Sequence, residues 1–219
     1  IDALQSSRVF SSLPMESIEK LAQYARYERF KQPTLIVAAG EPTKALRFVV
    51  KGYIAARAYA SPSIETELIP IQPGGFSAWI GTFTRAKMVQ DYWTAADTEL
   101  ITFPNNKMVE EADAYPLVYK QALEEIAHRF QLMLKWVWNS NQTDRHKRLA
   151  QHLLLYSSLK GFEQEIKIRV AQETLAKSLG CSRQTLNRQL RALEDIGLIQ
   201  IRYREIVVKD RHELEAFCT

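Results

Sequence analysis

The sequence predicts an α+β protein in which a β-rich first half is joined by one long helix to a helix-rich last third. Short β-prone segments between Gly- and Pro-containing turns run from residue 27 to residue 103, which is typical of a small barrel, roll or sandwich. Apolar residues at helical spacing follow Pro116, and two short amphipathic helices and a β-hairpin come near the end. With 219 residues the chain is long enough for one or two domains with a well-buried core.

The first half begins with a short helix and continues with strands. Residues 14 or 15 to 25 place Ile18, Leu21 and Ala22 on one side of a helix. Strands are expected at residues 34–38, 45–50, 53–59, 67–71 and 99–103. The segments between them, residues 40–42, 51–52, 61–63 and 73–75, carry turn-forming residues.

The long helix after Pro116 carries an apolar seam with a period of 3.5 residues over about three heptads. Its residues are Tyr119, Leu123, Ile126, Phe130, Met133 and Val137. This pattern packs one helix against a partner and predicts a dimer, although an amphipathic helix packed within its own chain is the alternative. Ala127, Leu134 and Trp138 widen the apolar face, so we expect the helix also to cover the β-rich part. Residues 139–141 resemble a hinge.

Helices at residues 145–159, 172–179 and 182–196 are expected next, with a strand at 166–170 and a hairpin of 198–202 with 205–209. Gly180 can supply the turn between two of these helices, because a left-handed backbone costs glycine little. Ser182 is well suited to cap the helix that follows.

Composition and charge exclude several classes of protein. The 46% hydrophobic and 25% charged residues are near the globular average, which argues against disorder. We expect a cytoplasmic protein, because no uncharged apolar run approaches the roughly 18–20 residues that span a bilayer and no signal for export is present. The net charge of +4 falls entirely on residues 142–219, with 14 Lys and Arg against 10 Asp and Glu, which suggests an anionic partner such as nucleic acid.

The two short helices around Gly180 have the pattern of a helix-turn-helix, whose second helix enters the major groove of DNA with its N-terminus first. Apolar side chains hold the helices together: Ala176, Leu179, Leu186, Leu190 and Leu193. Four polar side chains are left outward near the start of the second helix: Arg183, Gln184, Asn187 and Arg188. Arg can pair with guanine and Gln with adenine, and the helix N-terminus with Ser182 and Thr185 can bind a phosphate. We therefore predict binding to double-stranded DNA.

Residues 180–188, 193–199 and 206–208 closely resemble the Crp/Fnr family of bacterial transcription regulators, and residues 10–14, 39–41, 49–52 and 75–76 extend the likeness more weakly to the first half. The resemblance implies a jelly-roll-like β-roll sensor of the cyclic-nucleotide-binding type at residues 1–112. A dimerisation helix and hinge would follow at 113–141, and a winged helix-turn-helix at 142–219. It also implies a homodimer that reads a near-palindromic operator, through a recognition helix at 182–194, and acts on RNA polymerase.

The same resemblance assigns roles to individual residues. Arg183, Gln184 and Arg188 fall at positions of base contact, and Thr185 and the wing residue Arg204 fall at positions of backbone contact. Three residues depart from the family pattern: Gln184 replaces a common Glu, Gln172 stands where some members have a phosphate-binding Arg, and Tyr203 replaces a Gly at the wing turn. The operator sequence therefore cannot be copied from relatives.

The sensor half lacks the ligand chemistry of well-known members. Cyclic-nucleotide-binding relatives use a Gly-Glu pair for the ribose and an Arg-Ser pair for the phosphate. Here Trp79 stands in place of the carboxylate, Gln90 lies near the Arg position and Asp91 would repel phosphate, so the sequence argues against cyclic AMP. Residues 1–141 contain no cysteine for an iron–sulfur cluster, and no histidine precedes the long helix, so we expect no cofactor and no metal.

Aromatic residues in the sensor half allow two interpretations. They are Phe76, Trp79, Phe83, Tyr92, Trp93 and Phe103, and we expect them to fill the core. The alternative is a pocket for an unidentified apolar or aromatic effector, with candidates Phe76, Trp79, Arg85, Tyr92 and Trp93. A ligand-independent regulator, whose β-roll serves only dimerisation or a partner protein, is also open.

Catalysis and redox sensing are two further functions to weigh against the sequence. An enzyme is not expected, because we find no metal-spaced residues, nucleophile elbow or phosphate loop. Cys181 is expected to pack in the helix-turn-helix, while a redox role stays open because a helix N-terminus can lower the pKa of a thiol.

Overall fold

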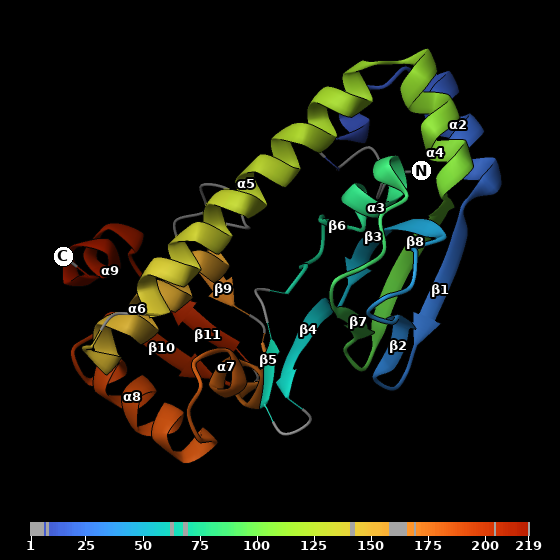
Figure 1. Ribbon diagram of the computed structural model, residues 1–219. Helices are drawn as coiled ribbons and strands as arrows, with labels where there is room; N and C mark the ends of the chain where they lie inside the picture. Colours follow the sequence, from blue (N-terminus) through green and yellow to red (C-terminus); the bar gives the residue numbers. More distant parts are fainter. Residues whose placement is uncertain are drawn as a thin grey trace. The chain divides into compact units, whose positions relative to one another are not determined.

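The computed structural model describes residues 7, 9–61, 64–67, 70–140, 143–157, 166–168, 170–203 and 205–218 (Figure 1). Two compact units can be distinguished, Ile1–Ile64 with Pro70–Arg129, and Glu65–Ile69 with Phe130–Thr219. The division falls inside the long helix α5, Leu117–Ser140. The sequence-based domain bounds at residues 112 and 141 stay a prediction. No helix in the described part of the chain is long and apolar enough to cross a membrane.

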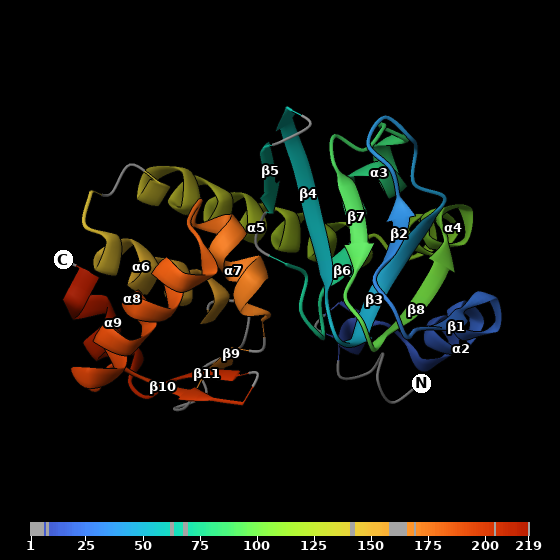
Figure 2. The ribbon, with the colours of Figure 1, turned by 90° about the horizontal axis from the view of Figure 1, so that it is seen from below.

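Two four-stranded sheets form the β-roll of the first unit. One sheet has the order β1-β8-β3-β6, with β1 Arg26–Phe30, β8 Thr98–Pro104, β3 Ala45–Lys51 and β6 Phe76–Ser77. The other has the order β2-β7-β4-β5, with β2 Thr34–Val37, β7 Asp91–Thr94, β4 Ile54–Ser61 and β5 Ile64–Glu67 (Figure 2). The strand pairs β1 with β8 and β4 with β7 run antiparallel. The α+β fold with an N-terminal β-roll is confirmed.

Short helices cover one face of the first sheet. They are the 3₁₀ helix η1 Phe10–Ser12, α2 Met15–Tyr24, α3 Trp79–Thr84 and α4 Asn105–Ala114. The helix predicted at residues 14 or 15 to 25 is confirmed as α2. Beneath these helices lies an aromatic core in which Phe76 contacts Phe10, Phe48 and Trp79 at ring-centroid distances of 4.9–5.2 Å.

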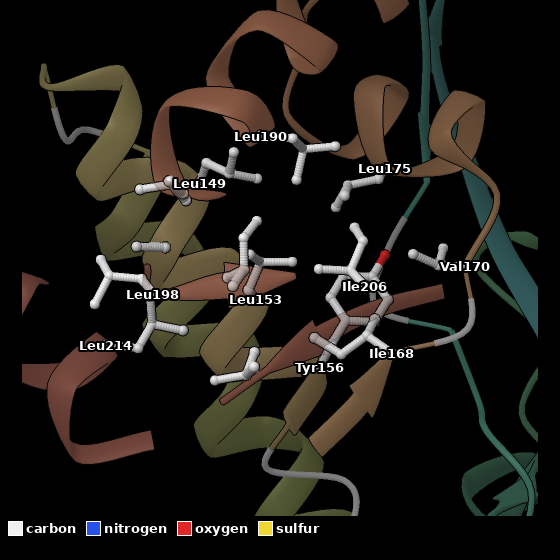
Figure 3. Close-up of a cluster of buried hydrophobic side chains, with 14 of the residues drawn as sticks. Leu149, Leu153, Tyr156, Ile168, Val170, Leu175, Leu190, Leu198, Ile206 and Leu214 are labelled. Atoms are coloured by element: carbon white, nitrogen blue, oxygen red, sulfur yellow. The ribbon is translucent and has the colours of Figure 1, made fainter. Parts of the chain in front are cut away.

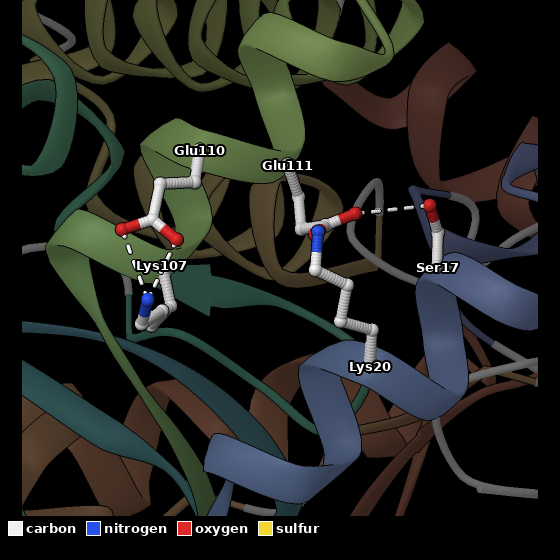
Figure 4. Close-up of polar contacts among 5 residues, drawn as sticks. All are labelled: Ser17, Lys20, Lys107, Glu110 and Glu111. Atoms are coloured by element: carbon white, nitrogen blue, oxygen red, sulfur yellow. Dashed lines mark hydrogen bonds and ion pairs between the residues drawn. The ribbon is translucent and has the colours of Figure 1, made fainter.

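A buried carboxylate fastens α2 to α4 (Figure 4). Glu111 is only 2% exposed, accepts a hydrogen bond of 3.0 Å from the Ser17 hydroxyl and forms an ion pair with Lys20. Lys107 pairs separately with Glu110 on the surface of α4, at 2.7 Å. Because a buried charge is tolerated only when it is paired, Ser17 and Lys20 fix the place of α2 on the roll.

Several elements differ from the sequence prediction. The strand expected at 67–71 lies partly outside the described residues; β5 covers Ile64–Glu67, and Ile71 forms an isolated bridge with Ile54. Helix α3 was not predicted, and its flanking residues Ala78 and Arg85 have φ values of 74° and 56°, which glycine normally supplies. Helix α4 and the C-terminal helix α9, Arg211–Cys218, were also missed. The helix and hinge expected at 145–159 and 139–141 extend beyond the described residues.

The second unit is built on helices α6 Arg145–Ser157, α7 Gln172–Ser178, α8 Arg183–Asp195 and α9. A three-stranded antiparallel sheet of order β10-β11-β9 completes it, with β10 Ile199–Arg202, β11 Glu205–Val208 and β9 Ile166–Ile168. Leu149 and Leu153 of α6, Leu190 of α8 and Ile206 of β11 meet in one buried cluster (Figure 3). This cluster supports the two helices that carry the candidate site.

Candidate DNA-binding site

The break between α7 and α8 is a Schellman motif centred on Gly180, whose φ is +62°. The Gly180 N–H donates to the Lys177 carbonyl at 3.1 Å, and the Cys181 N–H donates to the Ala176 carbonyl at 3.0 Å. These bonds satisfy the last carbonyls of α7 and turn the chain sharply. The predicted role of Gly180 is confirmed.

Ser182 caps α8 as predicted. Its hydroxyl accepts the N–H of Thr185 at 3.1 Å and lies 2.9 Å from the Thr185 hydroxyl. The cap satisfies one of the free amides at the helix N-terminus, while others stay available for an anion such as a phosphate.

Helix α8 has one apolar and one polar face. Leu186, Leu190 and Leu193 are fully buried, whereas Arg183, Gln184 and Arg188 are exposed and Asn187 is partly buried. The polar face is hollowed by an open groove of about 510 Å³, lined by Gln184, Asn187, Arg188, Arg191, Ala192 and Asp195. Three of the four predicted base-contact residues therefore line one groove. Sequence reasoning missed Arg191 and Asp195. Arg191 follows Arg188 by three residues and Asp195 follows Arg191 by four, so both lie on the same face of α8.

Arg183, the fourth of these residues, lies next to α7. Its Nε donates to Oε1 of Gln172 at 3.4 Å, so the first residues of the two helices touch. The side chain of Arg183 is exposed to solvent and takes no part in the buried cluster. Arg183, a predicted base contact, and Gln172, which departs from the family pattern, are thus neighbours in space.

The β10–β11 hairpin lies beside α8 and is tied to it. Oε1 of Glu194 on α8 accepts the Ile201 N–H of β10 at 2.6 Å. At the end of the hairpin Tyr203 is 88% exposed, and the guanidinium of Arg202 donates to Oε1 of Gln200 at 2.7 and 3.0 Å. Arg204, the predicted wing contact, lies outside the described residues.

Helix α6 supports the helix-turn-helix from inside. His152 is 2% exposed and its Nε2 lies 2.9 Å from the hydroxyl of Ser178 on α7. Because that hydroxyl donates to the Leu175 carbonyl, we assign the proton of the ring to Nε2, which then donates to Ser178. Burial lowers the pKa of His152 to about 4, and the charge of Arg148 acts in the same direction.

Cys181 packs partly buried against the same cluster, as expected from its place in the break. Burial raises the pKa of its thiol, while the positive charges of Arg148 and Arg145 act in the opposite direction. Burial is the larger of these effects, so the pKa of the Cys181 thiol is raised overall.

The residues proposed for an effector pocket are divided among different parts of the roll. Phe76 and Trp79 are buried together in the aromatic core, whereas Tyr92 packs against a second cluster around Ile54. Trp93 lies under the guanidinium of Arg57, 5.3 Å from its ring centroid, and Arg85 is exposed at the end of α3. The expected filling of the core by Phe76, Trp79 and Phe103 is observed.

Sequence reasoning missed Glu125 of α5, which lies against this core. Its Oε2 accepts the indole N–H of Trp79 at 2.7 Å, and its Oε1 accepts the backbone N–H of Phe76 at 3.1 Å. One signal in the sequence could have revealed Glu125. It is an acidic residue inside an apolar helix, and Arg129 follows it four positions later.

The predicted seam of α5 is mostly exposed. Leu123, Phe130, Met133 and Val137 are 65%, 53%, 42% and 45% exposed. Tyr119 and Ile126, in contrast, pack against the aromatic core of the roll. Large apolar side chains rarely form an exposed row on a monomer, so this face is a candidate interface.

Residues 147–217 match the Crp-like helix-turn-helix domain. The last third of the chain therefore carries a Crp-like helix-turn-helix domain. The chain is 24% identical over 197 residues to the cAMP-activated global transcriptional regulator CRP of Salmonella typhimurium, covering 88% of this chain and 93% of that protein. It is 21% identical over 203 residues to the cAMP-activated global transcriptional regulator Vfr of Pseudomonas aeruginosa, covering 89% and 94%.

Two solved structures share the fold of this chain. FixK2 of Bradyrhizobium japonicum superposes with a TM-score of 0.76 at 16% identity, covering 89% of this chain and 98% of FixK2. A CooA mutant of Carboxydothermus hydrogenoformans gives a TM-score of 0.70 at 17% identity, covering 90% and 89%. The chain is a DNA-binding transcription regulator of the Crp/Fnr type.

Proposed function

We propose that the protein is a homodimer that reads a near-palindromic operator through α8 in the major groove. Four residues make the base contacts: Arg183, Gln184, Asn187 and Arg188. The observation that carries this assignment is the division of α8 into a fully buried leucine face and a polar face that begins at its capped N-terminus. A helix with these two faces is what a helix-turn-helix needs to dock by its first turns.

Contacts to the DNA backbone position the helix in this proposal. Ser182 and Thr185, with the free amides at the start of α8, take one phosphate, and Gln172 at the start of α7 takes another. Arg204 supplies a wing contact. The bond between Glu194 and Ile201 supports the wing, because it fixes the hairpin to the recognition helix.

Dimerisation is assigned to the exposed apolar seam of α5. Leu123, Phe130, Met133 and Val137 follow one another at intervals of seven, three and four residues, and Trp138 beside them is 68% exposed. Burying such a row against a second copy removes its apolar surface from water and gives the two-fold symmetry that a palindromic operator requires.

The β-roll does not bind cyclic AMP in this proposal, although the relatives named above are cAMP-activated. Trp79, at the position of the ribose-binding carboxylate, is 3% exposed and its N–H is already bound by Glu125. In one form of the proposal the roll binds an unidentified small effector. In the other form the roll is a ligand-independent scaffold, which the burial of Phe76 and Trp79 in the core favours. RNA polymerase is the proposed protein partner.

Selection of bound sequences from a random DNA pool tests the proposal. We expect an enriched motif with two-fold symmetry, and a dimer in sedimentation of the protein and of its DNA complex. No enrichment, or a motif without symmetry bound by a monomer, would overturn the assignment. Titration with cyclic AMP tests the roll, where micromolar binding would contradict the loss of nucleotide chemistry.

A further inference from the structure

The long helix carries two opposite charges inside the stripe with which it packs on its own chain. That stripe contains Val118 and Ala122, which are buried, then Glu125 and Arg129, and farther on the buried Leu132. The five residues lie four, three, four and three positions apart, so they share one side of the helix. Placing a carboxylate and a guanidinium among apolar residues is costly unless both find partners.

The carboxylate of Glu125 finds its partners on the β-roll. The Trp79 indole and the Phe76 backbone donate to its two oxygens at 2.7 and 3.1 Å. Both donors lie where β6 leads into α3, and they are 46 and 49 residues away in the sequence. Glu125 therefore joins α5 to the loop that in nucleotide-binding relatives would carry the ribose-binding carboxylate.

The guanidinium of Arg129 balances this carboxylate one turn along the helix. Burial lowers the pKa of Arg129, and the negative charge of Glu125 and the neighbouring Tyr92 oppose that shift. Burial raises the pKa of Glu125, which the two hydrogen bonds and Arg129 oppose. Tyr92 on β7 in turn accepts a hydrogen bond of 3.2 Å from Gln90. Glu125 and Arg129 thus favour each other's charged form on one side of α5.

We propose that Glu125 is a built-in latch that fixes α5 on the β-roll, so that the protein binds its operator without any small effector. This inference rests on the proposed function and selects its ligand-independent form. Glu125 acts as a positioning residue, because it touches no DNA. It holds the helix whose exposed seam joins the two copies, and its contact with Trp79 occupies the donors that an anionic effector would otherwise use.

A double-mutant cycle tests the latch. Operator affinity of purified full-length protein is measured by fluorescence anisotropy, with no small molecule added, for the parent, Glu125→Ala, Trp79→Phe and the double variant. We expect the parent to bind, Glu125→Ala to bind at least about tenfold more weakly, and the double variant to bind no more weakly than Glu125→Ala. Such non-additivity is the signature of residues that act through each other.

Two further measurements separate a latch from a general loss of stability. Hydrogen exchange of the peptide that contains Phe76 is expected to speed up in Glu125→Ala, while exchange in α6 to α8 stays at the parent rate. Glu125→Gln, which keeps one oxygen acceptor, is expected to recover part of the affinity and carries the test if Glu125→Ala does not fold. Glu124→Ala, at the exposed neighbouring position, is the matched control and should bind like the parent.

The outcomes distinguish the latch from the proposed function. Additive losses, or Glu125→Ala binding within twofold of the parent, would overturn the latch while leaving the regulator intact. A parent that binds its operator only after a ligand is supplied would also overturn the inference, because the latch is proposed to make binding ligand-independent, while the proposed function would stand. A parent that selects no DNA sequence would refute the proposed function, and the exchange of the Phe76 amide would still report whether the latch holds α5.

Discussion

Lowering the pH is expected to weaken the unit that holds the recognition helix, through a single buried histidine. His152 has a pKa of about 4 in the folded protein, because burial disfavours its charged form, against an ordinary value of 6.5. Between these two values the unfolded chain binds a proton that the folded chain does not. The stabilisation that neutral His152 provides is therefore complete above pH 6.5 and is lost as the pH falls toward 4.

The magnitude follows from the size of the shift. One pKa unit corresponds to about 1.4 kcal/mol, so the difference amounts to roughly 3 kcal/mol at pH 4, of which about 2 kcal/mol is already lost at pH 5. A loss of this size is a large part of the usual stability of a small domain. The positive charge of Arg148 also disfavours a charged His152 ring.

The assay compares the parent with His152→Gln, in which a neutral amide can still donate to Ser178. Urea unfolding is followed by pulsed labelling and mass spectrometry of peptides from α6, α7 and α8 at pH 7, 6 and 5. Subtracting one pH profile of the free energy of unfolding from the other cancels the contributions of the other titrating groups. We expect the parent to lose about 2 kcal/mol more than His152→Gln between pH 7 and pH 5.

The control is His212→Gln, since the side chain of His212 is 94% exposed and lies 3.8 Å from Glu215 on the surface of α9. Its pH profile should follow that of the parent. Equal pH profiles for the parent and His152→Gln would refute the reasoning, because His152 would then titrate alike in the folded and unfolded chains.

Four substitutions test the rest of the site. Arg183→Ala is expected to cost about 1–3 kcal/mol of operator affinity and to relax preference at one base position, measured by anisotropy and sequence selection. Ser182→Ala removes the acceptor for the Thr185 N–H and should lower the free energy of unfolding by about 1 kcal/mol in urea titrations. Leu190→Ala empties a fully buried site and should cost about 2–5 kcal/mol in the same assay. Phe130→Glu places a charge in the exposed seam and should shift sedimentation from dimer to monomer.

Matched variants make these outcomes informative. Arg29→Ala changes an exposed arginine of the β-roll and should leave operator affinity unchanged. Gln131→Glu adds the same charge as Phe130→Glu at the next exposed position and should leave the dimer intact. Arg183→Ala with the parent's affinity and preference would move the DNA contact away from the start of α8, and a dimeric Phe130→Glu would move the interface away from the seam.

The helix-turn-helix could be predicted from the sequence because its signals are local. Gly180 and Ser182 mark the end of one helix and the start of the next within three residues, and α7 and α8 follow within one residue of the predicted bounds. In the β-roll the deciding contacts are distant. Helix α3 depends on left-handed Ala78 and Arg85, which no local rule favours, and Glu125 acquires its role only from donors far away in the chain.

Helix α5 has two stripes of residues, the predicted seam and the buried stripe. They explain why the sequence allowed both a dimerisation helix and a helix packed within its own chain. The predicted seam and the buried stripe both repeat every 3.5 residues, and they are offset by one position, as in Tyr119 against Val118. One residue corresponds to about 100° around a helix, so the stripes face different directions. Glu125 and Arg129 interrupt the apolar character of the buried stripe, which is why the sequence displays only the other one. The helix can thus pack on its own chain with one stripe and still offer Leu123 and Phe130 to a second copy.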